Sequence, residues 1–559
     1  MNVRAVLRGV VASLALASAA APAAAAAPSF QSGNGISVGQ VKRLSSRQFD
    51  VALRSSVVDG PLRVRVLLPA DYDERPGKRW PVLYLFHGTS GGASDWPEKG
   101  DAERTTARSD FITVMPDAGI DFDGGGYCTD WFNRGAGGKP MWETFEIDQV
   151  VPWIDANLRT LARREGRAIF GLSQGGFCAF SLAARHPDMF LSAGSYSGAI
   201  DSAKDAEGRA LMTPVVQATT TGLNGNEDPD AIFGPRPAQE INWAAHDPAT
   251  LVPNMRGMSL YAYTGDGRPG PLDGPEPNPA GAAIESGVRR LTQLWKANAD
   301  AAQIPVEYHD YGAGTHTWPY WARDLRESVG DIERDFTAAR PAPAEKFFMS
   351  ADARWSQWGY DVTLLRPARE FSTLRDADAD GFTLLGSGSG VVVTPAAYEP
   401  GAAATVRSAG AGGDAVRTLR VRRDGRLRVE VPLGPGNPYQ QSTPEAEAAG
   451  GTKVFTTRVA IDAPRRQAGS TTSSRRCTSR RSIVFRTLVP RGARIVSVRA
   501  VVRGRKRAVR AGRRSVTLSL RGLPASTYRV RLVLRVREAG RTRTIRITRR
   551  FRTCAPRRR

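Results

Sequence analysis

The sequence is poor in the side chains that most often carry out chemistry. Its 559 residues include only five histidines and four cysteines. After residue 27 it also lacks any apolar run close to the roughly 20 residues that a membrane-spanning helix needs. The lack of a long apolar run argues against a membrane-spanning helix after residue 27. The small number of histidines leaves few candidates for a histidine that acts as a base.

Acidic residues are nearly absent from one end of the chain. Of the 78 Lys and Arg residues, 31 fall within 465–559, where Glu538 is the only acid. The rest of the chain has 47 basic and 54 acidic residues, so its net charge is −7 and the total of +23 comes from the terminal segment. We expect this segment to bind an anionic cell-wall polymer or lipid headgroups. Nucleic acid is not expected, because few aromatic residues interleave the arginines. A merely solvated basic strand face is the alternative.

The first 27 residues have the features of a signal peptide. Arg4 and Arg8 precede an apolar stretch from Gly9 to Ala20, and the alanines from Ala23 to Ala27 offer cleavage sites. The apolar stretch is too short and too rich in alanine to favour a stable membrane anchor. We therefore expect residues 1–27 to direct export, and the mature protein to be secreted or associated with the cell wall.

Residues 28–340 alternate between strand-like and helical patterns. Continuous apolar runs such as Pro81–Phe86 and Phe111–Pro116 predict buried strands, and apolar residues recur at helical spacing between Phe145 and Leu158. Continuous apolar strands separated by helices are typical of a mostly parallel sheet covered on both faces. We therefore expect one large α/β domain over residues 28–340.

The pattern changes after the break at Pro341–Ala344. Residues 341–462 lose the helical period and gain short strands, which predicts a small all-β, sandwich-like domain. A polar linker over 463–475 leads to a second, basic all-β domain over 476–559. In its strands, arginine recurs on one face and Val, Ile and Leu on the other.

The segment Gly171–Gly175 reads Gly-Leu-Ser-Gln-Gly and has the pattern G-x-S-x-G. The apolar run Ala168–Phe170 precedes it, and a helical stretch from Gly176 to Arg185 follows. A serine on so sharp a turn from strand to helix projects its hydroxyl out of the sheet, and the glycines let the backbone turn without a clash. The sequence therefore predicts that Ser173 is a nucleophile.

A serine hydroxyl needs a base to take its proton and a third group to orient that base. In hydrolases with this elbow the three follow in the order serine, acid, histidine. Only His309 and His316 lie well beyond Ser173 and a plausible acid. His316 is in a loop after the strand-like segment Val306–Tyr308, where the base belongs, whereas His309 is closer to that strand. We therefore expect His316 to be the base and His309 to be structural.

Several motifs together resemble the esterase D/antigen 85 family, which includes secreted mycolyltransferases, over residues 36–340. The motifs are Phe86-His87-Gly88, Asp130-Trp131, Trp142-Glu143-Thr144-Phe145, the Ser173 elbow and Gly314-Thr315-His316-Thr317-Trp318-Pro319-Tyr320-Trp321. The resemblance implies an α/β-hydrolase fold with a glutamate as the acid, and Glu285, 31 residues before His316, matches it. Asp266, just after the strand-like Leu260–Thr264, and Glu276 are the alternatives for the acid.

The resemblance also implies an oxyanion hole made by backbone N–H groups. One donor is Gln174, directly after the nucleophile, and the other is Thr89, in the loop after the strand Val82–Phe86. Losing one such donor typically costs about 10²–10³ in rate. Aromatic residues near the motifs are expected to form either an apolar acyl pocket or ordinary core, and the substrate-binding candidates are Trp131, Trp142 and Trp318.

Two features depart from the antigen 85 pattern. The loop His87–Gly92 lacks the aspartate and the arginine that contact trehalose in that family. The family's short-range cysteine pair is also missing, with Cys128 alone in that region. The resemblance therefore implies acyl-enzyme chemistry without implying transfer to trehalose.

The cysteines raise two separate questions. Cys477 and Cys554 bracket the basic segment, and we expect a disulfide between them in an exported protein. Cys178 follows the elbow on the predicted helix, where a buried thiol is the first expectation. A bond between Cys128 and Cys178 stays open, because sequence does not decide pairing.

Together these features predict a secreted serine esterase or acyltransferase that acts on small acyl esters. We expect a monomer that needs neither metal nor cofactor. The segment Asp376–Gly381 resembles the start of a calcium loop, but Ser387 stands where a bidentate glutamate is needed, so a hairpin turn is expected there. The alternative from another class is an inactive hydrolase scaffold that binds the cell wall or matrix through its β-domains.

Overall fold

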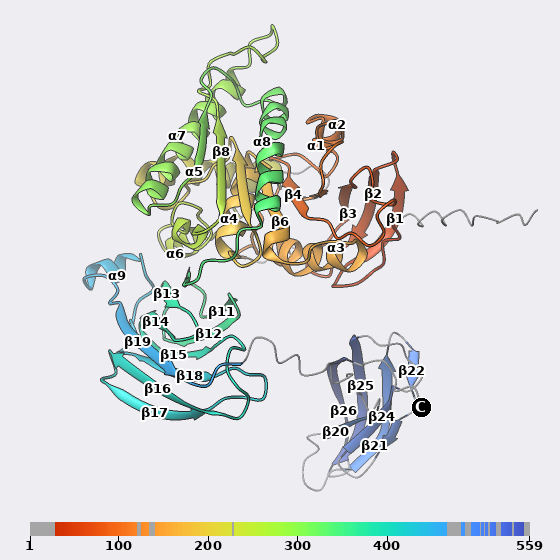
Figure 1. Cartoon of the computed structure of the whole chain (residues 1–559), viewed down its shortest axis with the longest axis vertical. Coiled ribbons are helices and arrows are strands. Elements are labelled where there is room, and N and C mark those ends of the chain that lie inside the picture. The colour runs from red at the N-terminus through yellow and green to blue at the C-terminus, as the bar shows by residue number, and fades with distance from the viewer. Residues whose placement is uncertain are drawn as a thin grey trace, which may run out of the picture. The chain divides into compact units, whose positions relative to one another are not determined.

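The computed structural model describes residues 28–119, 125–133, 140–225 and 228–466, and the terminal strands with Leu520. These residues form two compact units, which divide between Arg465 and Arg466 (Figure 1). The expected signal peptide, most of the expected linker, and the pair Cys477 and Cys554 lie outside the described residues.

A nine-stranded sheet forms the centre of the first unit, in the order β1-β2-β3-β5-β4-β6-β7-β8-β9. The neighbours from β1 to β5 pair antiparallel, and all later neighbours are parallel. This is the mostly parallel sheet of an α/β-hydrolase, as predicted. The strands are β1 (Ser37–Arg43), β2 (Gln48–Arg54), β3 (Leu62–Leu67), β4 (Val82–Phe86), β5 (Ile112–Pro116), β6 (Arg167–Leu172), β7 (Ser192–Tyr196), β8 (Ser259–Thr264) and β9 (Glu307–Asp310).

Helices cover both faces of this sheet. They are α1 (Asp95–Glu98), α2 (Ala102–Thr105), α3 (Val151–Asn157), α4 (Gln174–Arg185), α5 (Ala206–Ala218), α6 (Glu240–Ala244), α7 (Pro279–Ala301) and α8 (Trp318–Ala338). A π-helical turn, Thr144–Val150, leads into α3, and a second one, Thr219–Leu223, extends α5; short 3-10 turns span Arg164–Gly166 and Val252–Met255. The helix expected between Phe145 and Leu158 is therefore a π-turn followed by an α-helix.

Alternation along the strands divides the interior into two cores. In β4, Val82, Tyr84 and Phe86 belong to the larger core, which also holds residues of α3, α4 and α7. Leu83 and Leu85 point to the opposite face and join a core with residues of α8. Because both faces are buried, the strand reads as an unbroken apolar run.

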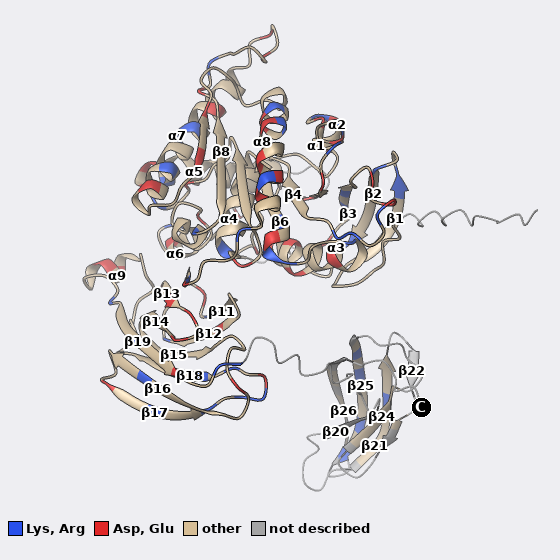
Figure 2. Ribbon diagram, viewed as in Figure 1, with Lys and Arg blue, Asp and Glu red and all other residues tan. Residues whose placement is uncertain are grey.

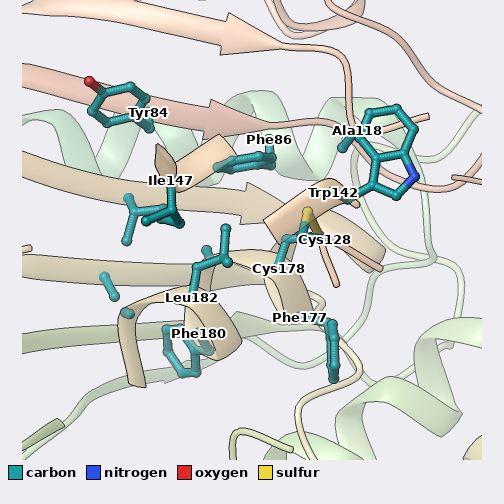
Figure 3. Close-up of a cluster of buried hydrophobic side chains, with 14 of the residues drawn as sticks. Tyr84, Phe86, Ala118, Cys128, Trp142, Ile147, Phe177, Cys178, Phe180 and Leu182 are labelled. Carbon is teal, nitrogen blue, oxygen red and sulfur yellow. A yellow bond between two sulfur atoms is a disulfide. The ribbon is translucent and has the colours of Figure 1, made fainter. Parts of the chain in front are cut away.

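A disulfide joins Cys128 to Cys178 within the larger core, 50 residues apart in sequence. Figure 3 shows it among Phe86, Trp142 and Phe177. The expectation of a free buried thiol at Cys178 is therefore wrong, and the pairing that the sequence left open is the one present. The bond ties the loop before Asp130 to the helix that follows the elbow.

Residues 346–462 form a two-sheet, all-antiparallel sandwich around its own apolar core, as predicted. One sheet has the order β10-β13-β14-β19-β16-β17 and the other β11-β12-β15-β18. The elements are β10 (Lys346–Ser350), β11 (Arg354–Gln357), β12 (Tyr360–Leu365), β13 (Ser372–Ala377), β14 (Gly381–Gly386), β15 (Gly388–Val393), β16 (Ala403–Gly410), β17 (Ala415–Arg420), β18 (Arg428–Leu433), α9 (Pro444–Ala448) and β19 (Phe455–Asp462). The segment Asp376–Gly381 contains the hairpin turn between β13 and β14, where Asp378 Oδ1 accepts from the backbone N–H of Asp380 and Gly381.

Polar contacts join this sandwich to the α/β domain. The side chain of Asn254 bonds both backbone groups of Met349 in β10, at 2.8 and 3.0 Å, and also donates to the carbonyl of Ala184. Gln357 of β11 donates to the carbonyl of Arg185 at 2.9 Å. These last two carbonyls end α4, where the helix itself supplies no donors. The sandwich therefore helps to cap the helix that begins at the elbow.

A cluster of charged side chains lies at the same junction. Arg185 bonds both oxygens of Glu143, at 2.9 and 3.0 Å, and reaches Asp352 of the sandwich at 3.4 Å. Burial would raise the pKa of Glu143, but the Arg185 charge and a hydrogen bond from His186 outweigh it and hold that pKa well below its usual range. Burial and the Arg185 charge together lower the pKa of His246 to about 4.

The second unit has two antiparallel sheets, in the orders β20-β24-β23 and β22-β21-β25-β26. The strands are β20 (Ser482–Arg486), β21 (Arg494–Val502), β22 (Arg505–Arg507), β23 (Val509–Ala511), β24 (Ser515–Ser519), β25 (Thr527–Glu538) and β26 (Arg541–Arg552). Residues of both sheets share one apolar core. The predicted all-β character of this segment is confirmed.

Within the part of the chain that the structure describes, no helix has both the length and the hydropathy to cross a bilayer.

Candidate active site

Ser173 occupies a strained turn between β6 and α4, with φ 52° and ψ −122°. Such a backbone is rare for a residue with a side chain and is typical of functional positions. A Cβ at Gly171 would collide with the carbonyl of Gly175, and one at Gly175 with the carbonyl oxygens of Phe86 and His87. The two glycines are therefore required by the close packing of the elbow against the end of β4.

His316 lies beside Ser173. Its Nε2 is 2.9 Å from Ser173 Oγ, and its Nδ1 is 2.7 Å from Glu285 Oε2. A carboxylate only accepts, so Nδ1 carries the proton and Nε2 is left to accept from the serine hydroxyl. The imidazole also stands edge-on against Trp321, with the ring centres 4.8 Å apart. This arrangement lets the imidazole take the serine proton.

Glu285 is a fully buried carboxylate with a complete set of donors. Its Oε1 accepts from Ser197 Oγ at 2.8 Å, from the N–H of Gly265 at 2.7 Å and from Thr264 Oγ1 at 3.3 Å. Its Oε2 faces His316. Because buried polar groups need hydrogen-bond partners, these donors satisfy the carboxyl group and fix its orientation toward His316.

The other residues considered for these roles lie elsewhere. Asp266 bonds the guanidinium and the backbone N–H of Arg268, and the hydrogen bond from that guanidinium lowers its pKa. Glu276 is exposed on the loop before α7. His309 is on β9 and stacks on Tyr263, with ring centres 4.2 Å apart. Only Glu285 of the three candidate acids meets His316.

The two expected oxyanion donors flank the serine. The N–H of Gln174 belongs to the first turn of α4, where a helix supplies no acceptor of its own. Thr89 follows β4 and lines the same cleft as Ser173. The side chain of Gln174 donates to Thr89 Oγ1 at 3.1 Å, which links the two segments.

A buried histidine orients the Thr89 segment. His87 Nε2 accepts from the N–H of Ala118 at 2.9 Å, so its Nδ1 carries the proton and donates to the carbonyl of Gly88 at 2.7 Å. In a trans peptide the N–H points away from the carbonyl. Because His87 fixes the Gly88 carbonyl, it also fixes the direction of the Thr89 N–H.

Asp117 supports the same loop from behind. Its carboxyl oxygens accept from the backbone N–H of Ala93, at 2.7 Å, and of Arg63, at 2.6 Å. Burial disfavours the charged form and raises the pKa of Asp117 to about 7. The group therefore changes its protonation near neutral pH while still accepting from the loop.

The serine opens into a cleft of about 790 Å³ with a mainly apolar lining. One wall comes from α5 and its π-turn and the other from α7, which are neighbours in the fold (Figure 1). Trp318 and Trp321 close the end beside His316. The apolar wall residues of the two helices are Leu211, Met212, Val215, Ile284, Val288 and Leu291.

Two of the three tryptophans expected to bind substrate are not in this cleft. Trp318 lines it, but Trp131 and Trp142 are buried in the larger core. Trp131 donates to the carbonyl of Gly126, and Trp142 packs edge-on against Phe145, with ring centres 5.9 Å apart. The expectation for Trp131 and Trp142 is therefore corrected: both are core aromatics.

The sequence reasoning did not identify the helical wall or Ser197. Leu211 and Val215 are four residues apart on α5 and stay 37% and 49% exposed. Exposed apolar residues at helical spacing beside a nucleophile were the signal that could have revealed the wall. Ser197 offered no such signal, because it reaches Glu285 only through the folding of β7 against β8.

Comparisons with known proteins find esterases and acyltransferases. Residues 55–332 match the protein family described as "Putative esterase". The esterase Rv1288 of Mycobacterium tuberculosis is 30% identical over 290 residues, which cover 50% of this chain and 56% of that protein. The diacylglycerol acyltransferase/mycolyltransferase Ag85B of Mycolicibacterium smegmatis is 29% identical, over 45% of this chain and 76% of its own length.

The chain thus spans little more than half the length of the esterase that it matches. Among solved structures, Mycobacterium tuberculosis MPT51 aligns with a TM-score of 0.42 and 21% identity, over 54% of this chain and 100% of that one. A ferulic acid esterase aligns with a TM-score of 0.37 and 22% identity, over 51% of this chain and 97% of its own. On the sequence matches, residues 55–332 fit the putative esterase family, and the antigen 85 proteins are relatives of the same part of the chain.

Proposed function

We propose that the protein is a serine esterase or acyltransferase that acts on carboxylic esters through a covalent acyl-serine. One observation carries this proposal: Ser173, His316 and Glu285 form a continuous chain of hydrogen bonds at the wall of an apolar cleft. Such a chain makes a serine hydroxyl nucleophilic at neutral pH, and this is its principal chemical use.

In the proposed reaction, Ser173 Oγ attacks the ester carbonyl while His316 Nε2 takes its proton. The carbonyl oxygen becomes negative and is held by the N–H groups of Gln174 and Thr89. His316 returns the proton to the leaving alcohol as the C–O bond breaks. Water or another hydroxyl then gives its proton to His316 and attacks the acyl-serine. His316 passes that proton to Ser173 Oγ as the acyl–serine bond breaks, which restores the free serine. Throughout, Glu285 orients the imidazole and stabilises its charged form.

The lining of the cleft supports an apolar acyl group as the part of the substrate next to Ser173. Leu211, Val215 and Ile284 remain partly exposed along the opening, so an aliphatic chain can extend between α5 and α7. Acyl lipids and acylated sugars both have this chemistry. Each Å² of apolar surface that the acyl group buries in the cleft would contribute about 25 cal/mol to binding, and no charged partner is needed for this.

A fluorophosphonate probe tests the proposal. We expect it to label the wild-type protein and to leave Ser173→Ala unlabelled. Ser286→Ala is the matched control, because Ser286 is an exposed serine on α7 next to Glu285. Labelling of Ser173→Ala, or absence of labelling in a folded wild-type protein, would contradict the proposal and favour the inactive scaffold.

Hydrolysis and transfer are separated by competing acceptors. With an aliphatic acyl ester as donor, trehalose and water compete for the acyl-serine. Because His87–Gly92 lacks an aspartate and an arginine, we expect free acid as the main product. An excess of acyl-trehalose would show that the acceptor site does not need those two residues.

We also propose that the protein is exported as a monomer and held at an anionic surface by residues 466–559. The support for this is the signal-like start of the chain and the strongly basic composition of that unit, in which Glu538 is the only acid. This part of the proposal is independent of the chemistry at Ser173. A cell-fractionation experiment tests it, with the protein expected outside the cytoplasm.

A further inference from the structure

The basic unit displays its arginines in an ordered row. Along β25, Val530, Leu532, Leu534 and Val536 are fully buried. The intervening positions are exposed, except for the half-buried Val533, and they hold Arg529, Arg531, Arg535 and Arg537. Because side chains alternate across a strand, these four arginines share one face. Figure 2 marks basic residues along this strand.

Strand pairing fills the gap in the row. Val533 is the one position of the face without a charge, and the register places Arg499 of β21 directly opposite it. Arg499 is also exposed. Opposite residues on paired strands lie about 5 Å apart, so a fifth guanidinium stands beside the gap. The row runs for about 26 Å, at 3.3 Å per residue.

The unit contains almost nothing that could neutralise this row. Between 466 and 559 the only acid is Glu538, at the end of β25, where the register pairs it with Arg541. Elsewhere in the chain acids outnumber bases. Holding five like charges in line is unfavourable without counter-charges, so this face is suited to an external anion.

We propose that this row, Arg499 with Arg529, Arg531, Arg535 and Arg537, is a binding track for a linear phosphodiester polymer that carries no bases. The inference rests on the surface-retention part of the proposed function and not on the chemistry at Ser173. Guanidinium groups hold phosphate oxygens through paired N–H donors. Same-face positions on a strand repeat about every 6.7 Å, which presents donors at regular steps to a chain with a phosphate in each repeat.

Two features favour a polymer over other anionic partners. Base stacking needs exposed aromatic rings, but the segment 466–559 has only Phe485, Tyr528 and Phe551, and Tyr528 is buried. Membrane attachment is strengthened by large apolar side chains next to the cations. The described face of β25 has none, with only the half-buried Val533 between its arginines.

The test compares two variants of the full-length protein for binding to poly(glycerol phosphate). The track variant replaces Arg529, Arg531, Arg535 and Arg537 with Gln. The control variant replaces the same number of exposed arginines in the sandwich of the first unit, namely Arg407, Arg417, Arg420 and Arg458.

We expect the track variant to bind about fivefold more weakly for each arginine removed. Its slope of log K against log salt should be less steep by about 3, because each arginine releases about 0.7 counterion from a single-stranded polyanion. The control variant should stay within about twofold of the wild type, since its arginines lie on another sheet. If the fourfold variant does not fold, Arg531→Gln alone should still weaken binding about fivefold.

Equal losses in both variants would overturn the proposal, because they would reflect net charge alone. Absence of binding by the wild type would overturn it as well. So would tighter binding to an oligo-dT of equal charge, or to equimolar phosphatidylcholine–phosphatidylglycerol vesicles. Hydrolysis of a soluble ester by both variants reports separately on Ser173, so failure of the track leaves the esterase proposal standing.

Discussion

The two β-rich regions of this protein have the same kind of architecture but use their charges in opposite ways. In the sandwich of residues 346–462, Asp352 and Arg369 are paired with each other, and Asp352 also meets Arg185 of the α/β domain. In the second unit, exposed arginines stand in a row with one acid in the whole segment. Paired charge holds one part of a protein to another, whereas unpaired charge of one sign is available to a partner.

The sandwich contacts the helix that follows the candidate nucleophile. Gln357 and Asn254 bond the last carbonyls of α4, and Ser173 stands at the first end of the same helix. The sandwich also bonds the loop that follows α4, because the backbone N–H of Trp358 donates to Asp188 at 2.8 Å. The sandwich is thus part of the framework that holds the elbow.

The largest effect should come from the buried carboxylate that meets His316. Glu285→Gln keeps the shape of the side chain but removes the carboxylate that orients and stabilises His316. We expect kcat to fall by about 10³–10⁴ with little change in KM, as when the acid of such a triad is replaced by its amide. Steady-state hydrolysis of a soluble ester measures this.

Asp266→Asn is the control for that experiment. Asp266 is bonded to Arg268 rather than to His316, so activity should stay within about twofold of the wild type. A large loss in Asp266→Asn together with normal activity in Glu285→Gln would reverse the assignment of the acid.

A smaller effect is expected at the junction between the sandwich and the α/β domain. Glu143→Gln leaves Arg185 buried without its main counter-charge, which costs about 3 kcal/mol of unfolding free energy. Asp352→Asn removes a partner that is 38% exposed, and solvent screening limits the cost to about 1 kcal/mol or less. Urea unfolding measures the loss of unfolding free energy in each variant. Equal losses in the two variants would contradict the expectation that the more deeply buried carboxylate contributes more.

The same junction predicts the direction of acid sensitivity. The folded-state pKa of Glu143 is below its unfolded value, so its contribution is fully present above the ordinary carboxyl pKa and is lost as the pH falls below it. Asp117 has the opposite sign: its raised folded pKa, about 7, removes stability as the pH rises from about 4 toward 7. In Glu143→Gln the loss of stability below pH 4.5 should be smaller than in the wild type.

The smallest effect on catalysis should follow deletion of the whole second unit. Removing residues 466–559 takes away a separate compact unit and no residue of the cleft. We expect kcat/KM for a soluble ester to change by less than about twofold, whereas binding to poly(glycerol phosphate) should be lost. A protein that keeps its binding after the deletion would place the polymer site in the first unit.

The sequence predicted secondary-structure elements well where the pattern of apolar residues was unambiguous. The run Pro81–Phe86 falls within one residue of the observed β4, and the helix expected from Gly176 begins two residues earlier, at Gln174. Burial on both faces makes such strands continuous in the sequence, so they stand out without any knowledge of packing. The expected order of serine, acid and histidine likewise needed only spacing and family resemblance, and the structure brings those three side chains together.

The parts that the sequence could not supply depend on packing between distant segments. Trp131 and Trp142 are part of the quoted motifs, yet both side chains are buried in the larger core. The cleft wall on α5 comes from a helix that carries no motif, and Ser197 meets Glu285 only because β7 and β8 are neighbours. Proximity in sequence does not determine which side of a sheet a loop side chain reaches.

The bond between Cys128 and Cys178 makes the active site depend on where the protein folds. Tyr127, which lines the cleft, and Cys128 both have positive φ, at 52° and 47°. The disulfide is the covalent link between this unusual backbone and the helix of the nucleophile. In a thiol-rich cytoplasm that link does not form. An oxidising compartment would therefore add, after synthesis of the chain, a covalent support for the Tyr127 side of the cleft.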